Sequence, residues 1–540
     1  MKKKSMNAHL QAGIVGGCPS RLQNDFSSVS EPIALSGQRQ LFIDDGIIER
    51  MEGLSREMHR LTRHSDRPLY PLPDPPAWER GGIYTRSAPQ WIPEEKVYKI
   101  WYACYDSLQF WTGNVKTSAG IAVSRDGLRW ERPRLGKVRW QGEDTNLIQF
   151  GSSVTIYCSG VIYDPHDRDP QRRYKTLVWA PPAFGDYWTA FGWYPVYSTD
   201  GIVWSAPVRE QRIDNHDDAC TIFDSLGNQF LMTGKHWKAD GNRMNANNPR
   251  DWGIRTSTNF DRWTQDSSVV FAPDRLDQEM GRERLKAIFA SPSRLHPAVN
   301  RPDEYMTDFY EVAVFVYEGL YFALLTVFDR SGQIREGPFA DNQQGILHFQ
   351  LAASRNLKDW IRLGNRTEFL SAADKTKFDC GGVFPCVPPL VMNNELWFYY
   401  CGFSRPHDDG RSIVSKDPDG LGLAKLRRDG FVSLNAAGQT GTLVTRPFLL
   451  QGDSLRVNVD ASRGELKVAL ANLDGSLLPG YGFEDAGAVV GDRPAEQVAF
   501  RKAALPRSPV RVMFRVTNAR LFSFWEGSGA DNMHKEAGSP

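Results

Sequence analysis

The chain has 540 residues and carries 65 Lys and Arg side chains against 64 Asp and Glu, a formal net charge of +1. This balance argues against a nucleic-acid or polyanion binder, which needs a basic excess to displace counterions. The hydrophobic fraction of 41% and the charged fraction of 24% are ordinary for a folded protein, and no apolar run is long enough to predict a membrane span.

The first 35 residues are predicted to form a poorly ordered extension. Asn7, His9 and Gln11 interrupt the apolar run that a secretory signal requires, so we expect a cytoplasmic protein. The residues before Cys18 also resemble a lipoprotein cleavage site, and this alternative stays open. The seven cysteines include no CxxC motif, and no Cys/His spacing fits a zinc site. We expect neither a metal nor a cofactor.

A Ser-x-Asp-Gly-x-x-Trp motif recurs along the chain. It begins at Ser124 and Ser198, weaker copies begin at Ser257 and Ser354, and a relic lies at residues 428–431. Asp or Asn followed by Gly accepts the positive φ of a tight turn, and the Trp is expected to pack inward. Each copy therefore predicts a hairpin.

A second series consists of aromatic-rich strands, and each member precedes one of these turns. Its five members are residues 97–103, 174–179, 229–233, 320–325 and 396–401. Because each aromatic strand is followed by one of the motif turns, the two series predict a structural repeat of about four strands. Such a repeat fits the blades of a propeller. We expect five blades over residues 36–434. The opening strand 40–43 is expected to complete the last blade and close the ring, which hides sheet edges.

The C-terminal part alternates apolar and polar residues at 455–460, 465–470 and 510–516. This pattern predicts an antiparallel β-sandwich over residues 435–527, followed by a frayed tail at 528–540. The polar segments 235–251 and 274–303 are expected to be long loops. The predicted fold class is therefore all-β, a five-bladed β-propeller followed by a C-terminal antiparallel β-sandwich.

The turns, the opening segment 41–45 and the run 455–470 together resemble a glycosidase superfamily that includes glycoside hydrolase families 32, 43 and 68. The closer likeness is to distant bacterial members of family 32. The resemblance implies a glycosidase (EC 3.2.1.-) that cleaves a glycosidic bond with acids from three blades around a central funnel. The family's Asn-Asp-Pro signature of the first blade is absent here, and the predicted second inner strand, 155–161, carries no acid.

Two acidic clusters precede apolar strands that we expect to be innermost. Asp217 is the preferred candidate base or nucleophile and Asp218 is the alternative, because neighbours on a strand point oppositely and only one of the two can face the funnel. Glu311 is the candidate acid, since aromatic neighbours raise the pKa of a carboxyl group by desolvation. Asp308 is expected to support it. Solvated turns and structural salt bridges are the alternatives.

Polar and aromatic residues near the predicted funnel mouth are candidates for carbohydrate binding. Trp78 would stack on a sugar ring, Glu79 would hydrogen-bond hydroxyl groups, and Asp74 is the nearest substitute for the missing signature. The remaining candidates are Arg86, His216, Arg405 and His407. Ordinary loop packing is the alternative for each. The acid clusters 167–169 and 408–409 are expected to be solvated rather than to bind Ca²⁺.

Two further functions remain open beside the hydrolase. A sugar phosphorylase on the same scaffold would need cations around a phosphate, for which the candidates are Arg86, His216, Arg255 and His407. A non-catalytic propeller that binds a glycan or a protein partner is the other, and the missing acid of the second blade favours it. We expect a carbohydrate partner and no nucleic acid.

Overall fold

The structure is a computed structural model, and it describes most of residues 31–527. The positions in that range that it does not describe are 36, 72, 107–116, 151–158, 180–183, 186–189, 215–217, 236–248, 266–268, 338–339, 341, 408–418, 437 and 503. The outermost residues 1–30 and 528–540 also lie outside the described part.

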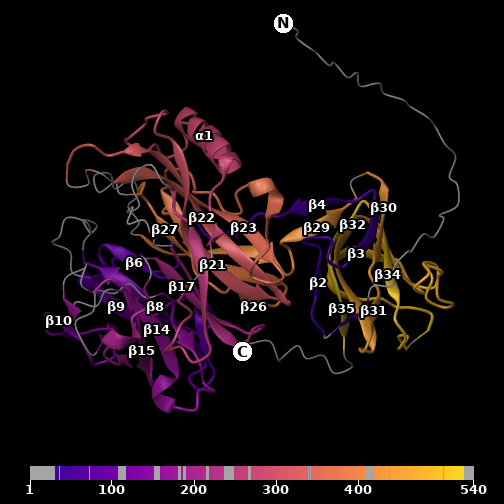
Figure 1. Cartoon of the computed structure of the whole chain (residues 1–540), viewed down its shortest axis with the longest axis horizontal. Coiled ribbons are helices and arrows are strands. Elements are labelled where there is room, and N and C mark those ends of the chain that lie inside the picture. The colour runs from indigo at the N-terminus through magenta and orange to yellow at the C-terminus, as the bar shows by residue number, and fades with distance from the viewer. Residues whose placement is uncertain are drawn as a thin grey trace, which may run out of the picture.

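Five antiparallel sheets follow one another along the chain and form the blades of a propeller (Figure 1). Blade 1 holds β6 (Gly82–Tyr84), β7 (Gln90–Ile92), β8 (Val97–Tyr105) and β9 (Thr117–Ser124). Blade 2 holds β13 (Ile162–Tyr163), β14 (Tyr174–Trp179), β15 (Trp193–Ser198) and β16 (Val203–Trp204), with β12 (Gln149–Phe150) added in parallel at its edge. A separate hairpin pairs β10 (Arg139–Trp140) with β11 (Glu143–Asp144).

The next three blades repeat the pattern. Blade 3 holds β17 (Ala219–Asp224), β18 (Gln229–Lys235), β19 (Trp252–Ser257) and β20 (Val269–Phe271). Blade 4 holds β21 (Met306–Tyr317), β22 (Leu320–Gln333), β23 (Gln343–Ser354) and β24 (Trp360–Arg362). Blade 5 holds β25 (Gly382–Pro385), β26 (Leu390–Met392), β27 (Glu395–Phe403) and β28 (Gly420–Arg427). Short 3₁₀ turns lie at Ala77–Glu79, Pro170–Arg172, Arg209–Gln211 and Leu363–Arg366.

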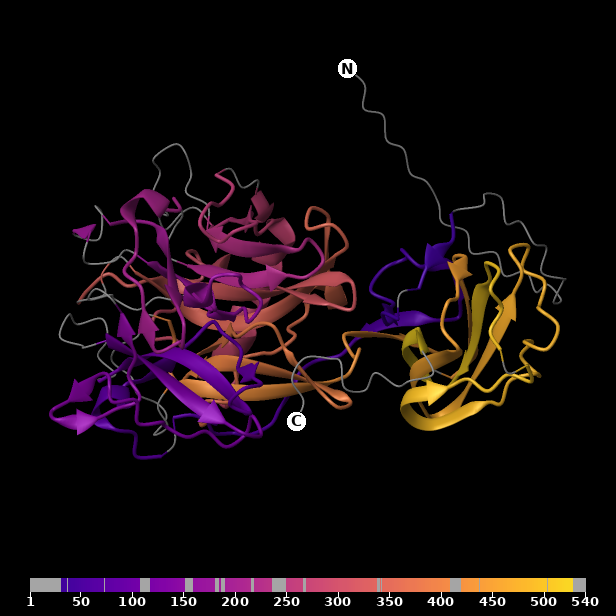
Figure 2. The same cartoon turned by 90° about the horizontal axis from the view of Figure 1, so that it is seen from below.

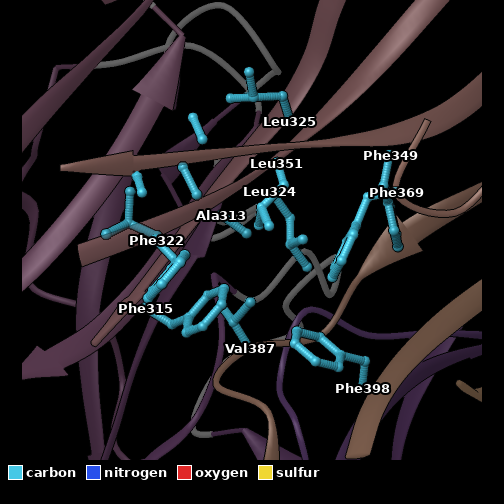
Figure 3. Close-up of a cluster of buried hydrophobic side chains, with 14 of the residues drawn as sticks. Ala313, Phe315, Phe322, Leu324, Leu325, Phe349, Leu351, Phe369, Val387 and Phe398 are labelled. Atoms are coloured by element: carbon cyan, nitrogen blue, oxygen red, sulfur yellow. The ribbon is translucent and has the colours of Figure 1, made fainter. Parts of the chain in front are cut away.

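The five-bladed propeller predicted from the repeats is confirmed, and the aromatic series forms β8, β14, β18, β22 and β27. These are the second strands of blades 2, 3 and 4, and in blades 1 and 5 each follows two short strands that both pair with it. The largest apolar cluster of the described residues includes four aromatic rings that lie together between blades 4 and 5 (Figure 3). They are Phe315, Phe322, Phe369 and Phe398. The rings of Phe315 and Phe322 are stacked with centroids 5.6 Å apart. Burial of such rings on the inner sheet faces is the main favourable contribution to blade packing.

Ring closure differs from the prediction. The outer strand of blade 5 is β5 (Thr62–Arg63), which pairs with Ala424 and Lys425 of β28. The segment that was expected there contains β2 (Gln40–Leu41), which pairs instead with β35 of the C-terminal domain. Its alternating side chains serve two cores, because Leu41 packs in the propeller core whereas Phe42 packs in the C-terminal one.

The C-terminal domain is an antiparallel sheet that folds over on itself around a second apolar core (Figure 2). Its C-terminal strands are β29 (Val432–Asn435), β30 (Thr440–Thr445), β32 (Ser454–Ala471), β33 (Val489–Gln497), β34 (Arg511–Thr517) and β35 (Arg520–Gly527). The first part of β32 pairs with β35 and its last part pairs with β34, so this long strand carries the fold-over.

Three strands of this sheet come from the N-terminal side of the chain, in a stretch that the sequence assigned to the propeller. They are β2, β3 (Ile48–Glu52) and β4 (Ser55–Met58), drawn in indigo beside the yellow strands in Figure 1. In addition, β1 (Ile33–Ala34) pairs in parallel with β31 (Phe448–Leu449), so part of the predicted poorly ordered extension is a strand.

The motif turns join the third strand of a blade to the segment that follows it. In blade 2, Asp200 accepts hydrogen bonds from the backbone N–H groups of Ile202 and Val203, and Gly201 has φ +73°. The Trp204 indole donates to the Gly201 carbonyl at 3.1 Å. The Trp101 indole of the neighbouring blade donates to the same carbonyl at 2.8 Å, so the turn also joins two blades.

The polar segment 274–303, expected to be a loop, contains the helix α1 (Arg275–Ala290). Asp274 and Asp277 form a capping box that starts the helix. Gly281 has no room for a side chain beside Thr307, so the helix lies directly on blade 4 (Figure 1). Within the described residues, no helix is long and apolar enough to cross a membrane.

Candidate functional site

The first strands of blades 1 and 5 are interrupted in the same way. Both β6 and β7 pair with β8, and the residues between them leave the ladder. Both β25 and β26 pair with β27, and Ser87 and Val387 from the two interruptions form a parallel bridge. Ser87 Oγ also accepts a hydrogen bond from the Val161 N–H of blade 2. Residue 86 therefore lies where the inner edges of three blades meet.

Arg86 joins two carboxyl groups from other blades. Its Nε donates to Glu311 Oε1 of blade 4 at 2.9 Å, and its Nη2 donates to Asp218 of blade 3. Lys235 Nζ, at the end of β18, donates to the other oxygen of Asp218. The exposed fractions are 3% for Arg86, 5% for Asp218 and 0% for Glu311. The acids predicted for blades 3 and 4 thus meet on a guanidinium from blade 1.

Glu311 has further donors on either side. Tyr84 OH donates to its Oε2 at 3.2 Å, and the Cys220 thiol donates to its Oε1 at 2.7 Å. Burial raises the pKa of Glu311, the Arg86 guanidinium opposes this shift, and the charge of Asp218 adds to it; the net direction is upward. Burial also raises the pKa of Cys220, so this side chain remains a thiol that can donate.

A β-bulge re-aims the side chains at this point of blade 4. Phe309 pairs with Val327 and Glu311 pairs with Thr326, so Tyr310 is the extra residue. In a regular strand Tyr310 and Glu311 would point to opposite faces, whereas a bulge turns the side chains of its extra residues toward one side. This irregularity lets Tyr310 and Glu311 serve the same site.

The half-buried Tyr310 connects the acid group to a second cluster of charges. Lys235 Nζ lies 4.7 Å from the centre of the Tyr310 ring, and the Arg250 guanidinium lies 4.9 Å from it. The Tyr310 hydroxyl is 3.0 Å from His407 Nε2, and His407 Nδ1 is 3.0 Å from the Gln343 carbonyl. Tyr310 and His407 are both less buried than the acids.

Asp308 is fully buried and lies between two guanidinium groups. It accepts hydrogen bonds from the Arg250 backbone N–H at 2.5 Å, from the Arg250 side chain and from Arg330. Burial alone would raise the pKa of Asp308, but Arg250 and Arg330 outweigh it and lower the pKa below its usual value. Asp308 therefore stays ionised and holds Arg250 beside Tyr310.

Trp78 and Glu79, expected to bind substrate, lie in a buried network of blade 1. Glu79 is 0% exposed and accepts from the hydroxyls of Tyr70 at 2.8 Å and Tyr102 at 2.5 Å. It also accepts from Arg132 Nε at 2.8 Å. The Trp78 indole donates to Asn146 at 3.0 Å. These partners all belong to residues 70–146, and the predicted substrate-binding role of the pair stays a prediction.

Five other candidates remain, and the structure describes three of them. Asp74 is exposed in a turn with φ +56°. Arg405 pairs with the buried Asp419 at 2.6 Å. The Arg255 side chain donates to the carbonyl groups of Thr264 and Asp214. His216 and Asp217 lie outside the described residues.

Several members of the site were not predicted. They are Tyr84, Cys220, Lys235, Arg250, Tyr310 and Arg330. Lys235 and Arg250 lie near the two ends of the polar insertion 235–251, next to the strands β18 and β19. This position, next to the strands of blade 3, is the sequence feature that could have identified them as site residues. Within the described part of the chain, no group of three His, Cys, Asp or Glu side chains is arranged to hold a metal ion.

No protein-family model matches the sequence, and no curated protein matches it. Among solved structures, the chain is similar to a glycoside hydrolase family 43 arabinoxylan arabinofuranohydrolase from Bacillus subtilis, with 10% identity, a TM-score of 0.33, and coverage of 87% of this chain and 99% of that chain. A family 32 β-fructofuranosidase from Bombyx mori gives 10% identity, a TM-score of 0.36, and coverage of 87% and 93%.

A third similar structure is an N-acetylgalactosamine deacetylase from F. plautii, with 14% identity, a TM-score of 0.39, and coverage of 69% of this chain and 96% of that chain. Families 43 and 32 are two of those named by the resemblance in the sequence. At these identities and TM-scores the likeness does not bear on the reaction.

Proposed function

We propose that the protein is a carbohydrate-active enzyme, a glycoside hydrolase that cleaves its substrate at the inner edge of the propeller. The observation that carries the proposal is the guanidinium of Arg86, which holds one carboxyl group from blade 3 and one from blade 4 side by side. Cleavage of a glycosidic bond by acid/base catalysis needs two carboxyl groups in different protonation states, and the raised pKa of Glu311 suits it to be the protonated one.

In this proposal Glu311 is the general acid. Its raised pKa keeps the carboxyl group protonated at a higher pH than an ordinary Glu, as proton donation to a leaving oxygen requires. Asp218 is the base or nucleophile, and Lys235 and Arg86 balance its negative charge. When substrate enters past Tyr310 and His407, Arg86 exchanges one of its carboxylate partners for sugar hydroxyl groups.

The first test is an activity screen on aryl glycosides and oligosaccharides with Asp218→Asn and Glu311→Gln. We expect each variant to lose about 10²-fold or more in kcat, the usual contribution of a positioned acid or base. Asp379→Asn is a matched control, because Asp379 is a fully buried acid that pairs with Arg63 and Tyr400 in blade 5. Equal activity of wild type and both site variants would refute the assignment.

A sugar phosphorylase is the second candidate, and the cations beside the acids favour it. Lys235, Arg250 and Arg330 accompany Arg86 around Tyr310 and Asp308, and such groups bind phosphate well. Phosphate dependence separates the two reactions. Turnover that requires inorganic phosphate and releases a sugar phosphate would identify the phosphorylase, whereas glycan binding without turnover on any substrate would favour a non-catalytic propeller.

A further inference from the structure

A hollow of about 710 Å³ opens between the start of α1, the first residues of β21 and the end of β22. This volume is in the range of small-molecule binding sites, about 300–1,000 Å³. The hollow adjoins the candidate site at three points. Pro249 in its wall precedes Arg250, Met306 lies two residues before Asp308, and the Gln343 carbonyl contacts the His407 ring.

The walls combine apolar surfaces with side-chain amides. Pro249, Pro273, Tyr305 and Met306 supply apolar surface, and Gln333 and Gln343 supply amide groups. The amide of Gln278, also in the wall, is hydrogen-bonded through both its nitrogen and its oxygen to the Thr307 backbone. Apolar faces pack on the C–H faces of sugar rings, while amide groups can both donate to and accept from hydroxyl groups. This combination is typical of a site for a flat, polyhydroxylated ligand.

The charges of the walls balance. Arg275, Arg282 and Arg335 face Asp274, Asp303 and Glu304, so the lining carries no net charge. Glu304 is held by Arg335 at 2.5 Å, and Asp274 is held by Arg366 outside the lining. An anionic ligand such as a uronic acid or a sugar phosphate would gain nothing from a neutral lining. The ligand class that fits is an uncharged oligosaccharide.

We propose that this hollow is a subsite for the more distant sugar units of a neutral oligosaccharide whose cleaved bond lies beside Arg86. The inference rests on the proposed function for the position of the bond, but not for the binding of the sugar. It predicts that the protein prefers chains of several units over a single sugar, because each further unit gains contacts in the hollow.

The variant that tests the subsite is Arg282→Trp, which places an indole in the hollow from the exposed face of α1. Lys286→Trp is the matched control: Lys286 is an exposed cation one helical turn further on, and it does not line the hollow. The probes are ladders of neutral oligosaccharides prepared from xylan, mannan, arabinan and inulin, from the single sugar to the hexamer. Their equilibrium binding is measured with the full chain by calorimetry.

We expect affinity to rise with chain length for one ladder, and Arg282→Trp to weaken binding of the longer members about tenfold, or about 1.4 kcal/mol. Lys286→Trp should bind as wild type does. The kcat/KM of a long substrate divided by that of a short one should also fall in Arg282→Trp. In Lys286→Trp this ratio should equal that of wild type. Affinity that does not depend on chain length in any ladder would overturn the proposed subsite. Affinity that is unchanged in Arg282→Trp would overturn it as well.

The design separates this inference from the proposed function. Binding that depends on chain length and is weakened in Arg282→Trp, without turnover of any substrate, would support the subsite and refute the hydrolase. Turnover that is lost in Glu311→Gln but is equal for short and long substrates would support the hydrolase and refute the subsite.

Discussion

At the scale of single residues, His348 shows how burial makes stability depend on pH. Burial and then the charge of Arg284 lower the pKa of His348 from 6.5 to about 4, so the ring is neutral in the folded protein. The unfolded chain takes up the proton between those values, and the free energy of unfolding should therefore fall as the pH drops from 6.5 to 4. The His348 contribution to that loss is about 3 kcal/mol.

Chemical denaturation at a series of pH values checks this prediction. His348→Gln keeps a polar side chain beside Asp329 and Gln350 but cannot titrate. Its unfolding free energy should depend less steeply on pH than that of wild type between pH 6.5 and 4. Parallel pH curves for the two proteins would show that His348 is not the group that titrates.

At the same scale, the sequence predicted the acids of the site better than their partners. Asp218 directly precedes the apolar strand β17, Glu311 precedes the apolar run 312–316 within β21, and this local pattern is visible in one sequence. Cys220 and Lys235 are linked to these acids by contacts across strands and blades, which a linear pattern does not encode. Glu79 shows the converse, because an acid near the expected mouth is fully buried among its own neighbours.

At the scale of elements, the motif turns link each blade to the next. A Cβ added at Gly201 would lie 2.8 Å from the Trp101 ring of blade 1, and φ there is +73°. Gly201→Ala should therefore cost more than about 1 kcal/mol in stability. Gly136→Ala is the control, because Gly136 has φ +65° but no neighbour within 4 Å. Thermal unfolding measures both, and equal losses would exclude the contact between the blades.

The turns, which have a local signal, were predicted, whereas the closing strand, whose place depends on two apolar cores, was not. The turns require Asp or Asn beside a residue with positive φ, and they recur with Phe260 and Leu357 in place of Gly. The closing strand was misplaced because the 41–43 run is apolar on both sides and fits between the domains. The helix α1 was missed although its capping acids, Asp274 and Asp277, were present in the sequence.

At the scale of the whole molecule, a buried carboxylate joins the propeller to the C-terminal domain. Asp429 follows the last strand of the propeller and is 0% exposed. It accepts hydrogen bonds from Arg39 at 2.8 Å, Tyr317 at 2.6 Å and Ser523 at 2.6 Å, which come from three distant parts of the chain. Asp429 belongs to the relic of the motif at residues 428–431, and the chain leaves the ring at this point.

Removal of this carboxylate should loosen the junction. Asp429→Ala leaves Arg39 buried without its closest acid, a change that typically costs about 3–5 kcal/mol. Asp45→Ala, which breaks the exposed ion pair with Arg56, should cost at most about 1 kcal/mol. Urea unfolding compares the two variants. Similar small losses in both would mean that the Asp429 network contributes little to the junction.

The most direct test of the central claim, that Glu311 donates the proton to the leaving oxygen, is a comparison of leaving groups. A poor leaving group needs that proton and a good one does not. In Glu311→Gln, kcat/KM should fall about 10²-fold or more for an alkyl glycoside of the preferred sugar but only slightly for its dinitrophenyl glycoside. An equal loss for both substrates, or no loss for either, would contradict the claim.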